Sequence, residues 1–322
     1  MNHQIVTTFG EGNIQALNIC KDLSTLVPPQ DEELVFDMRR YGENNPFSNL
    51  VLVNSLRRFK DNHKDSQLFC KPKEPNGYLS HIGFYKASGI RFGNSPGEAR
   101  ASSNYVPITA IQLNDSDFYD SIELRAQELA ATLGFDPALQ QMLQYIFIET
   151  IRNVFEHANT DLVWVAAQKW PTYNLVEIAI ADSGEGIYGS LGKVFAINES
   201  EILRLACKPG ITARSNHNYL DAEDSWRNSG YGLYMMKELA IAYQGSLLLC
   251  SGKYAVRYSS EGEEIFQTNY MGTAIGIRFY IDKAEDFNKV RDRILLTGEK
   301  EAKEIKGAIK KASRSSGGRY HF

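Results

Sequence analysis

Short strands and helices are predicted to alternate along the first third of the chain. Between residues 33 and 113, short β-rich runs are separated by segments in which apolar residues recur at helical spacing. The predicted elements are strands over 33–38, 67–70 and 105–113 and helices over 47–59 and 78–85. This alternation is typical of a small α/β domain, whereas the first 32 residues give no clear pattern.

The pattern changes near residue 115, where two longer amphipathic helices precede a series of strands. One helix is predicted over 117–133, and Asp136 followed by Pro137 is a typical start for a second helix that extends to His157. Later elements are strands over 162–168, 175–181, 246–250 and 274–280 and helices over 199–206 and 230–242. The stretch 187–229 is long and irregular, and such loops in compact domains usually serve a function.

The second long helix carries a polar stripe. Glu149, Asn153 and His157 are spaced four apart, so they share a face beside an apolar stripe that packs inward. A carboxylate and an amide can order a water and ligate a hard cation, and Mg²⁺ needs few protein oxygens when phosphates also bind it. Taken alone, the pattern is more typical of an ordinary amphipathic helix with a hydrated edge.

A glycine-containing turn follows the strand predicted over 175–181. The apolar run ends in Asp182-Ser-Gly184-Glu-Gly186, in which the glycines allow the backbone to approach a ligand closely. An aspartate at a strand end can accept a hydrogen bond from an amino group in a pocket. A plain strand and turn with a capping aspartate would have the same sequence, so this motif alone leaves both interpretations open.

Two further glycine motifs occur nearer the C-terminus. Gly230-Tyr-Gly232 opens a helix, and a helix N-terminus with free N–H groups suits phosphate binding. Glycine-rich turns before helices are common, so this motif alone favours a structural role. Gly272-Thr273 precedes the last predicted strand and is uninformative in isolation.

In order, spacing and predicted context, the four motifs resemble those of the GHKL superfamily of ATP-binding domains. This superfamily includes gyrase B, the large heat-shock chaperone ATPases, histidine kinases, MutL and the anti-sigma-factor serine kinases. The resemblance covers about 118–282 and implies an α+β fold, with a Bergerat-type α/β sandwich over 115–282. A smaller α/β domain over 1–114 would precede it, and a basic, helical or disordered tail over 283–322 would follow. The first domain loosely resembles STAS-like domains, but a generic α/β regulatory domain fits equally well.

The resemblance also implies a role for each motif residue. Asn153 would ligate Mg²⁺, Asp182 would bind the adenine amino group of ATP, and Glu149 would act as a general base. Lys208 lies in a segment similar to the one that precedes the ATP lid, and the lid would span 187–229. The other residues implied to form the nucleotide site are Gly184, Gly186, Ile187, Gly230, Tyr231, Gly232, Leu233 and Thr273.

Hydrolysis of ATP as a conformational switch is the function expected from these roles. One alternative is a protein serine/threonine kinase of the anti-sigma type, in which Glu149 would activate a partner's hydroxyl group. Another is a non-catalytic nucleotide sensor or scaffold. An autophosphorylating histidine kinase is disfavoured, because the helix over 117–133 contains no histidine. A cation for the γ-phosphate could come from Lys208, Arg214, the basic tail or a partner.

Composition narrows the expected partners. The chain of 322 residues has a formal net charge of −4, which disfavours a dominant polyanion-binding surface. Residues 303–322 are strongly basic, so nucleic acid is a possible partner only through this tail, and a protein partner or homodimer is expected. No apolar run approaches a membrane span, and the four cysteines form no CxxC pair, so a cytoplasmic location without zinc is expected.

Overall fold

Helices and strands are both abundant in the computed structural model of the chain, and the larger of its two sheets is antiparallel. The mixed α and β character that the sequence predicts is therefore confirmed. The structure describes residues 3–7, 12–27, 33–39, 41, 45–65, 67–71, 77–89, 104–112, 118–134, 136–213, 229–281 and 286–313.

Eight strands form two sheets within these residues. The strands are β1 (His3–Thr7), β2 (Glu33–Asp37), β3 (Gln67–Lys71), β4 (Tyr105–Gln112), β5 (Leu162–Trp170), β6 (Leu175–Asp182), β7 (Ser246–Ser259) and β8 (Gly262–Tyr280). The helices are α1 (Asn13–Thr25), α2 (Pro46–Asn62), α3 (Tyr78–His81), α4 (Phe84–Ser88), α5 (Phe118–Leu133), α6 (Pro137–His157), α7 (Gly186–Leu191), α8 (Glu199–Ala206), α9 (Gly232–Ala242) and α10 (Phe287–Glu304).

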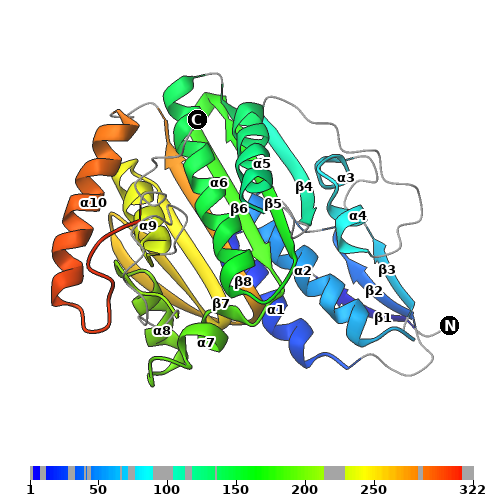
Figure 1. The fold of residues 1–322 in the computed structure, drawn as a ribbon. Coiled ribbons are helices and arrows are strands. Elements are labelled where there is room, and N and C mark those ends of the chain that lie inside the picture. Colours follow the sequence, from blue (N-terminus) through cyan, green and yellow to red (C-terminus); the bar gives the residue numbers. More distant parts are fainter. Residues whose placement is uncertain are drawn as a thin grey trace.

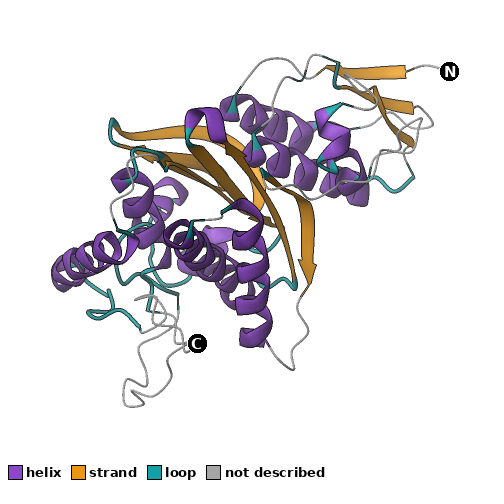
Figure 2. Cartoon of the chain, turned by 90° about the horizontal axis from the view of Figure 1, so that it is seen from above, coloured by secondary structure: helices purple, strands orange, loops and turns teal. Residues whose placement is uncertain are grey.

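The larger sheet has the strand order β4-β5-β6-β8-β7, and every neighbouring pair is antiparallel. Helices α5, α6, α9 and α10 cover one face of this sheet (Figure 1). Helices α1 and α2 lie on the opposite face, between the larger sheet and the smaller one (Figure 2). The larger sheet is therefore buried on both faces.

Side-chain size differs between the two faces of this sheet. Along β6, Ile178 and Ile180 belong to the core beneath α6, whereas Ala179 and Ala181 face α2. Small residues on the second face let α2 pack closely, and a Cβ atom at Gly276 of β8 would lie only 2.8 Å from the Phe47 ring. The alternation of Ile and Ala along β6 thus places large side chains in the core beneath α6 and small side chains where α2 packs closely against the sheet.

The N-terminal unit is built on the three-stranded parallel sheet β1-β2-β3. A buried carboxylate joins it to the larger sheet, because Glu177 of β6 accepts hydrogen bonds from Asn45 Nδ2 at 3.1 Å and from the Phe47 N–H at 3.3 Å. Arg278 of β8 pairs with the same carboxylate at 2.6 Å. Strand β4, within the range 1–114 expected for the first domain, pairs with β5 in the larger sheet. The two units therefore share a core that the predicted boundary divides.

Helix starts agree closely with the sequence. Asp136 accepts a hydrogen bond from the Leu139 N–H at 2.9 Å, which caps α6 as predicted. The helix predicted over 78–85 is in fact two short helices, because Gly83 has a φ of 85° and breaks the turn between α3 and α4. Helices α1 and α7 and strand β1 were not predicted. The stretch 89–100, whose glycine and serine content is typical of a loop, lies, apart from Gly89, outside the described residues.

The C-terminal region is packed against the core over the residues described. Phe287, Val290 and Ile294 of α10 are buried, so the region 286–304 is an integral helix, although a loose tail was an expected alternative. The segment that follows runs back over the loop at Gly210, where the Ile309 N–H donates to the Gly210 carbonyl at 2.7 Å. Lys310 Nζ donates to the Ile305 carbonyl at 2.8 Å, near the end of α10.

Two other expectations bear on location. Among the described helices, none combines the length and apolar character that a membrane span requires. All four cysteines carry free thiols, and Cys20, Cys207 and Cys250 are buried.

Candidate functional site

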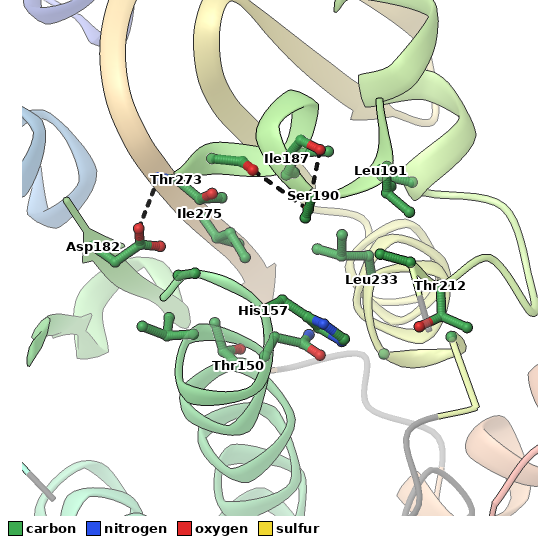
Figure 3. A pocket seen from close by; sticks show the side chains of 18 of the residues that line it. Thr150, His157, Asp182, Ile187, Ser190, Leu191, Thr212, Leu233, Thr273 and Ile275 are labelled. Carbon is green, nitrogen blue, oxygen red and sulfur yellow. Dashed lines mark hydrogen bonds between the residues drawn. The ribbon is translucent and has the colours of Figure 1, made fainter. Parts of the chain in front are cut away.

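A cavity opens between the end of α6, the end of β6 and the start of α9, and it encloses about 760 Å³ including its mouth. Apolar walls predominate, with polar groups at separate places (Figure 3). Of the residues expected to form the nucleotide site, the cavity is lined by Asn153, Asp182, Gly186, Ile187, Gly230, Gly232, Leu233 and Thr273.

The polar stripe of α6 divides between the cavity and the protein interior. Asn153 and His157 line the cavity, whereas Glu149 is fully buried one turn earlier and does not line it. Each step of four residues turns about 40° further around a helix of 3.6 residues per turn, so the stripe winds around α6. Thr150, on the adjacent position, lines the cavity instead.

Glu149 forms a buried ion pair. Its Oε2 atom accepts a hydrogen bond from Arg152 Nη2 at 2.8 Å, and both side chains are almost completely excluded from solvent. Its Oε1 atom has no hydrogen-bond partner among the described residues. Burial raises the pKa of the Glu149 carboxyl, the Arg152 guanidinium opposes this shift, and the nearby Glu156 carboxylate adds to it.

Asp182 ends β6 with a buried carboxylate at the cavity wall. Its Oδ1 atom accepts hydrogen bonds from the Gly184 N–H at 2.7 Å and the Thr273 N–H at 3.2 Å. Both bonds go to the same oxygen, and Oδ2 accepts no hydrogen bond from the part of the chain that the structure describes. Burial raises the pKa of this carboxyl to about 7, although the two N–H groups oppose the shift. Asp182 therefore keeps one open acceptor beside the cavity.

Gly184 does not line the cavity but joins two of its walls. A Cβ atom there would overlap the Ala158 carbonyl group at the end of α6, so only glycine fits. The Glu185 N–H donates to that same carbonyl at 2.9 Å. Because of this contact, the turn after β6 is held against α6, and Asp182 and Asn153 face one space.

The N-terminus of α9 forms another wall. Its first residues, Gly232 and Leu233, line the cavity, and no side chain caps the helix start. A Cβ atom at Gly232 would lie 3.0 Å from Glu149 Oε2 and 3.1 Å from Asn153 Nδ2, so the glycine lets the helix start approach both side chains. An uncapped helix N-terminus offers N–H groups and a positive dipole end to an anion.

Two remaining residues of the expected set lie away from the cavity. Lys208 pairs with Glu301 of α10 at 3.1 Å. Tyr231 is buried, and its hydroxyl donates to the Ile309 carbonyl at 3.2 Å. Of the expected lid, Ile187 to Ala213 and Ser229 belong to the described residues, and Arg214 and the rest do not.

Several cavity residues had no distinguishing signal in the sequence. Ser190 and Leu191 come from the stretch expected to be a lid, and nothing in their spacing marks them. Ile211, Thr212 and Ala213 also line the cavity, and they belong to the segment with Lys208 that resembles the one before the ATP lid. Ser251 of β7 does not line the cavity but supports its wall. Its hydroxyl accepts a hydrogen bond from the Ile187 N–H at 2.9 Å and donates one to the Gly272 carbonyl at 2.7 Å. Only the three-dimensional arrangement reveals these residues.

Comparison with known proteins adds no assignment, since no protein-family model matches the chain and no curated protein matches its sequence.

Proposed function

We propose that the chain binds ATP together with Mg²⁺ and hydrolyses it, so that the nucleotide state sets the position of the lid expected over 187–229. One observation carries the proposal: a single cavity combines the buried Asp182 carboxylate with the uncapped N-terminus of α9. A base amino group needs an acceptor, and phosphates need N–H donors and positive charge. An adenine nucleotide carries these two groups at its opposite ends. The apolar wall formed by residues such as Ile180 and Ile275 suits the base between them.

Asn153 is the residue that would hold Mg²⁺. Its side chain lines the cavity beside the start of α9 and forms no hydrogen bond within the described residues. No group of three or more His, Cys, Asp or Glu side chains suited to a metal occurs among those residues. One amide ligand fits Mg²⁺, which commonly takes its other ligands from phosphates and water. The bound ion would supply charge neutralisation at the phosphates.

Glu149 is the proposed general base. Its Oε1 atom has no hydrogen-bond partner among the described residues, and its Oε2 atom, which accepts from Arg152, lies beside Gly232. A carboxylate in this role must lie within hydrogen-bond reach of the attacking water, and Gly232 is the residue between Glu149 and the cavity. Having no side chain, Gly232 keeps this approach short.

A non-catalytic nucleotide sensor is the second candidate, and the Glu149–Arg152 pair is the observation that favours it. Arg152 holds one oxygen of the Glu149 carboxylate, and Glu149 does not line the cavity, so the carboxylate is fixed away from the bound nucleotide. In a sensor, the pair would be a structural device at the base of the cavity, and nucleotide would bind without turnover.

Calorimetric titration with ATP, with and without Mg²⁺, tests binding. Asp182→Asn would retain an acceptor for Gly184 and Thr273 but turn an amide N–H₂ donor toward the base amino group. We expect it to weaken ATP binding by at least tenfold, about 1.4 kcal/mol. Asp161→Asn makes the same change at an exposed carboxylate and should bind as wild type does. Equal affinity in the two variants would remove the basis of the proposal.

Turnover separates hydrolysis from sensing. If Glu149 is the base, Glu149→Gln should bind ATP normally and release phosphate at least about a hundredfold more slowly than wild type. Asn153→Ala should lose the Mg²⁺ dependence of binding. If the wild-type protein binds ATP but releases phosphate as slowly as Glu149→Gln does, the chain belongs instead to the sensor class.

A further inference from the structure

A second cavity lies behind the Asp182 turn, on the opposite face of the larger sheet. It is enclosed by α1, α2 and the part of β8 before Gly272, and it holds about 990 Å³ including its mouth. Ser183 lines this cavity, whereas its neighbour Asp182 lines the first one. The two cavities are thus separated by the end of β6 and the adjoining part of β8.

The lining of the second cavity is partly polar and includes one guanidinium group. Arg58 of α2 and His63 just beyond its end line it, together with hydroxyl and amide side chains. No carboxylate is among the described lining residues, and Arg58 forms no ion pair in the described part of the chain. An unpaired guanidinium beside several donors favours an oxyanion.

Asn54 adds a requirement for a hydrogen-bond donor on the ligand. Tyr270 donates its hydroxyl hydrogen to the Asp182 carbonyl at 3.0 Å, so the Asn54 amide must donate to the Tyr270 oxygen, which it does at 2.8 Å. This orientation leaves Asn54 Oδ1 as an acceptor, and it has no partner although the side chain is only 3% exposed. A buried carbonyl oxygen without a partner costs free energy that a ligand N–H or O–H would recover.

We propose that this cavity is a second ligand site, which binds a small oxyanion that also carries a hydroxyl or amino donor. Arg58 contacts the anionic group, and Asn54 Oδ1 accepts from the donor. The site is independent of the nucleotide cavity in its lining residues.

Isothermal titration of the full chain with D-ribose 5-phosphate and with L-malate tests the site. Each probe pairs an oxyanion with hydroxyl groups, one as a phosphate and the other as a carboxylate. We expect at least one to bind with a dissociation constant of about 10 mM or lower. Methyl phosphate, as its dianion at pH 8, and succinate lack the hydroxyl donor that the wild-type site requires, and should bind more weakly than ribose 5-phosphate and malate, respectively.

Variants then locate the binding. Arg58→Gln should weaken the bound probe about tenfold, whereas Lys64→Gln removes the same charge from an exposed position outside the lining and should have no effect. Asn54→Ala should remove the preference for the hydroxyl-bearing probe. The proposed site is wrong if neither probe binds, or if Arg58→Gln and Lys64→Gln bind the probe equally well.

The same residues connect the two cavities. A hydrogen-bonded chain runs from Asn54 through Tyr270 to the Asp182 backbone, and Tyr270 is fully buried along it. If the proposed nucleotide function is correct, a bound probe should change the affinity for ADP, and ADP should change the affinity for the probe by the same factor, about fivefold or more. Tyr270→Phe removes both hydrogen bonds of this chain and should abolish the coupling. Probe binding without ADP binding would refute the nucleotide function alone.

Discussion

Arg152 Nη2 lies 2.8 Å from Glu149 Oε2 in an ion pair from which solvent is almost entirely excluded. The two residues are three apart on α6, so the same helical turn that presents Asn153 to the cavity also buries this pair. Charges removed from water are costly, and each depends on the other for compensation. The stability of the fold and the proposed role of Glu149 as a general base therefore depend on the same carboxylate and guanidinium groups.

Removing Arg152 should destabilise the protein strongly. Arg152→Met leaves the Glu149 carboxylate without its cation, and we expect a loss of about 3–5 kcal/mol in the free energy of unfolding, measured by urea denaturation. Adding Glu149→Gln to this variant should recover part of the loss, because the uncompensated charge is removed.

Arg125→Met provides the matched control. Arg125 pairs with Glu128 at the same spacing of three residues, but both side chains are more than half exposed. An exposed pair contributes about 0–1 kcal/mol, so this variant should unfold almost as wild type does. Equal losses in Arg152→Met and Arg125→Met would contradict the role given to burial.

The α6 region shows how far the sequence alone could lead. The Asp136 cap and the apolar period predicted α6 from its first residue to its last, because local signals determine helix ends. The spacing of four identified Asn153 as a candidate, the glycine-containing turn after the strand identified Asp182, and both line one cavity. The spacing did not reveal that Glu149 pairs with Arg152, because both lie on a helix and the choice between water and a buried partner depends on packing across the fold.

Stability should fall as pH rises through neutrality, because of Asp182. Burial raises its folded-state pKa to about 7, while an unfolded aspartate titrates near 3.9, so the folded state holds the proton more tightly. The resulting stabilisation is complete below about pH 4 and is lost between about pH 4 and 7. It amounts to about 4 kcal/mol at most. Asp182→Asn should remove this part of the pH dependence, as thermal melts at pH 5 and pH 8 can show. Parallel pH profiles of the two proteins would contradict it.

Gly184 should not tolerate any side chain. In Gly184→Ala the new Cβ would overlap the Ala158 carbonyl group, so the turn after β6 must move away from α6. We expect a loss of about 1–3 kcal/mol or more in unfolding free energy. At Gly134, a Cβ atom would meet side-chain atoms of Leu139, at 3.3 Å, and Gln140, at 3.5 Å, so Gly134→Ala is the milder control. If Gly184→Ala and Gly134→Ala unfold at the same urea concentration, the overlap with the Ala158 carbonyl group does not affect stability.

Long-range contacts account for most of what the sequence did not predict. Strands β7 and β8 were expected to be short, but they extend into a hairpin in which the first residues of β8 are exposed and Ala255 and Val256 of β7 are buried. Pairing between the strands stabilises the exposed residues. Helix α10 was expected only as one form of a basic tail, because its buried residues are few and its partners, α6 and α9, are distant in sequence.

The segment after α10 should stabilise the base of the expected lid. Ile309 bonds to Gly210, and Tyr231 bonds to Ile309, so this segment contacts Gly210 within the expected lid and Tyr231 just after it. A chain that ends after Glu304 would lose these bonds, and hydrogen exchange should accelerate about tenfold or more at the Gly210 amide, which itself donates to the Gly230 carbonyl. A chain that ends after Ser313 keeps both contacts and should exchange at the wild-type rate. Exchange at Gly210 that is unchanged in the shorter chain would show that the lid base is held without the C-terminal segment.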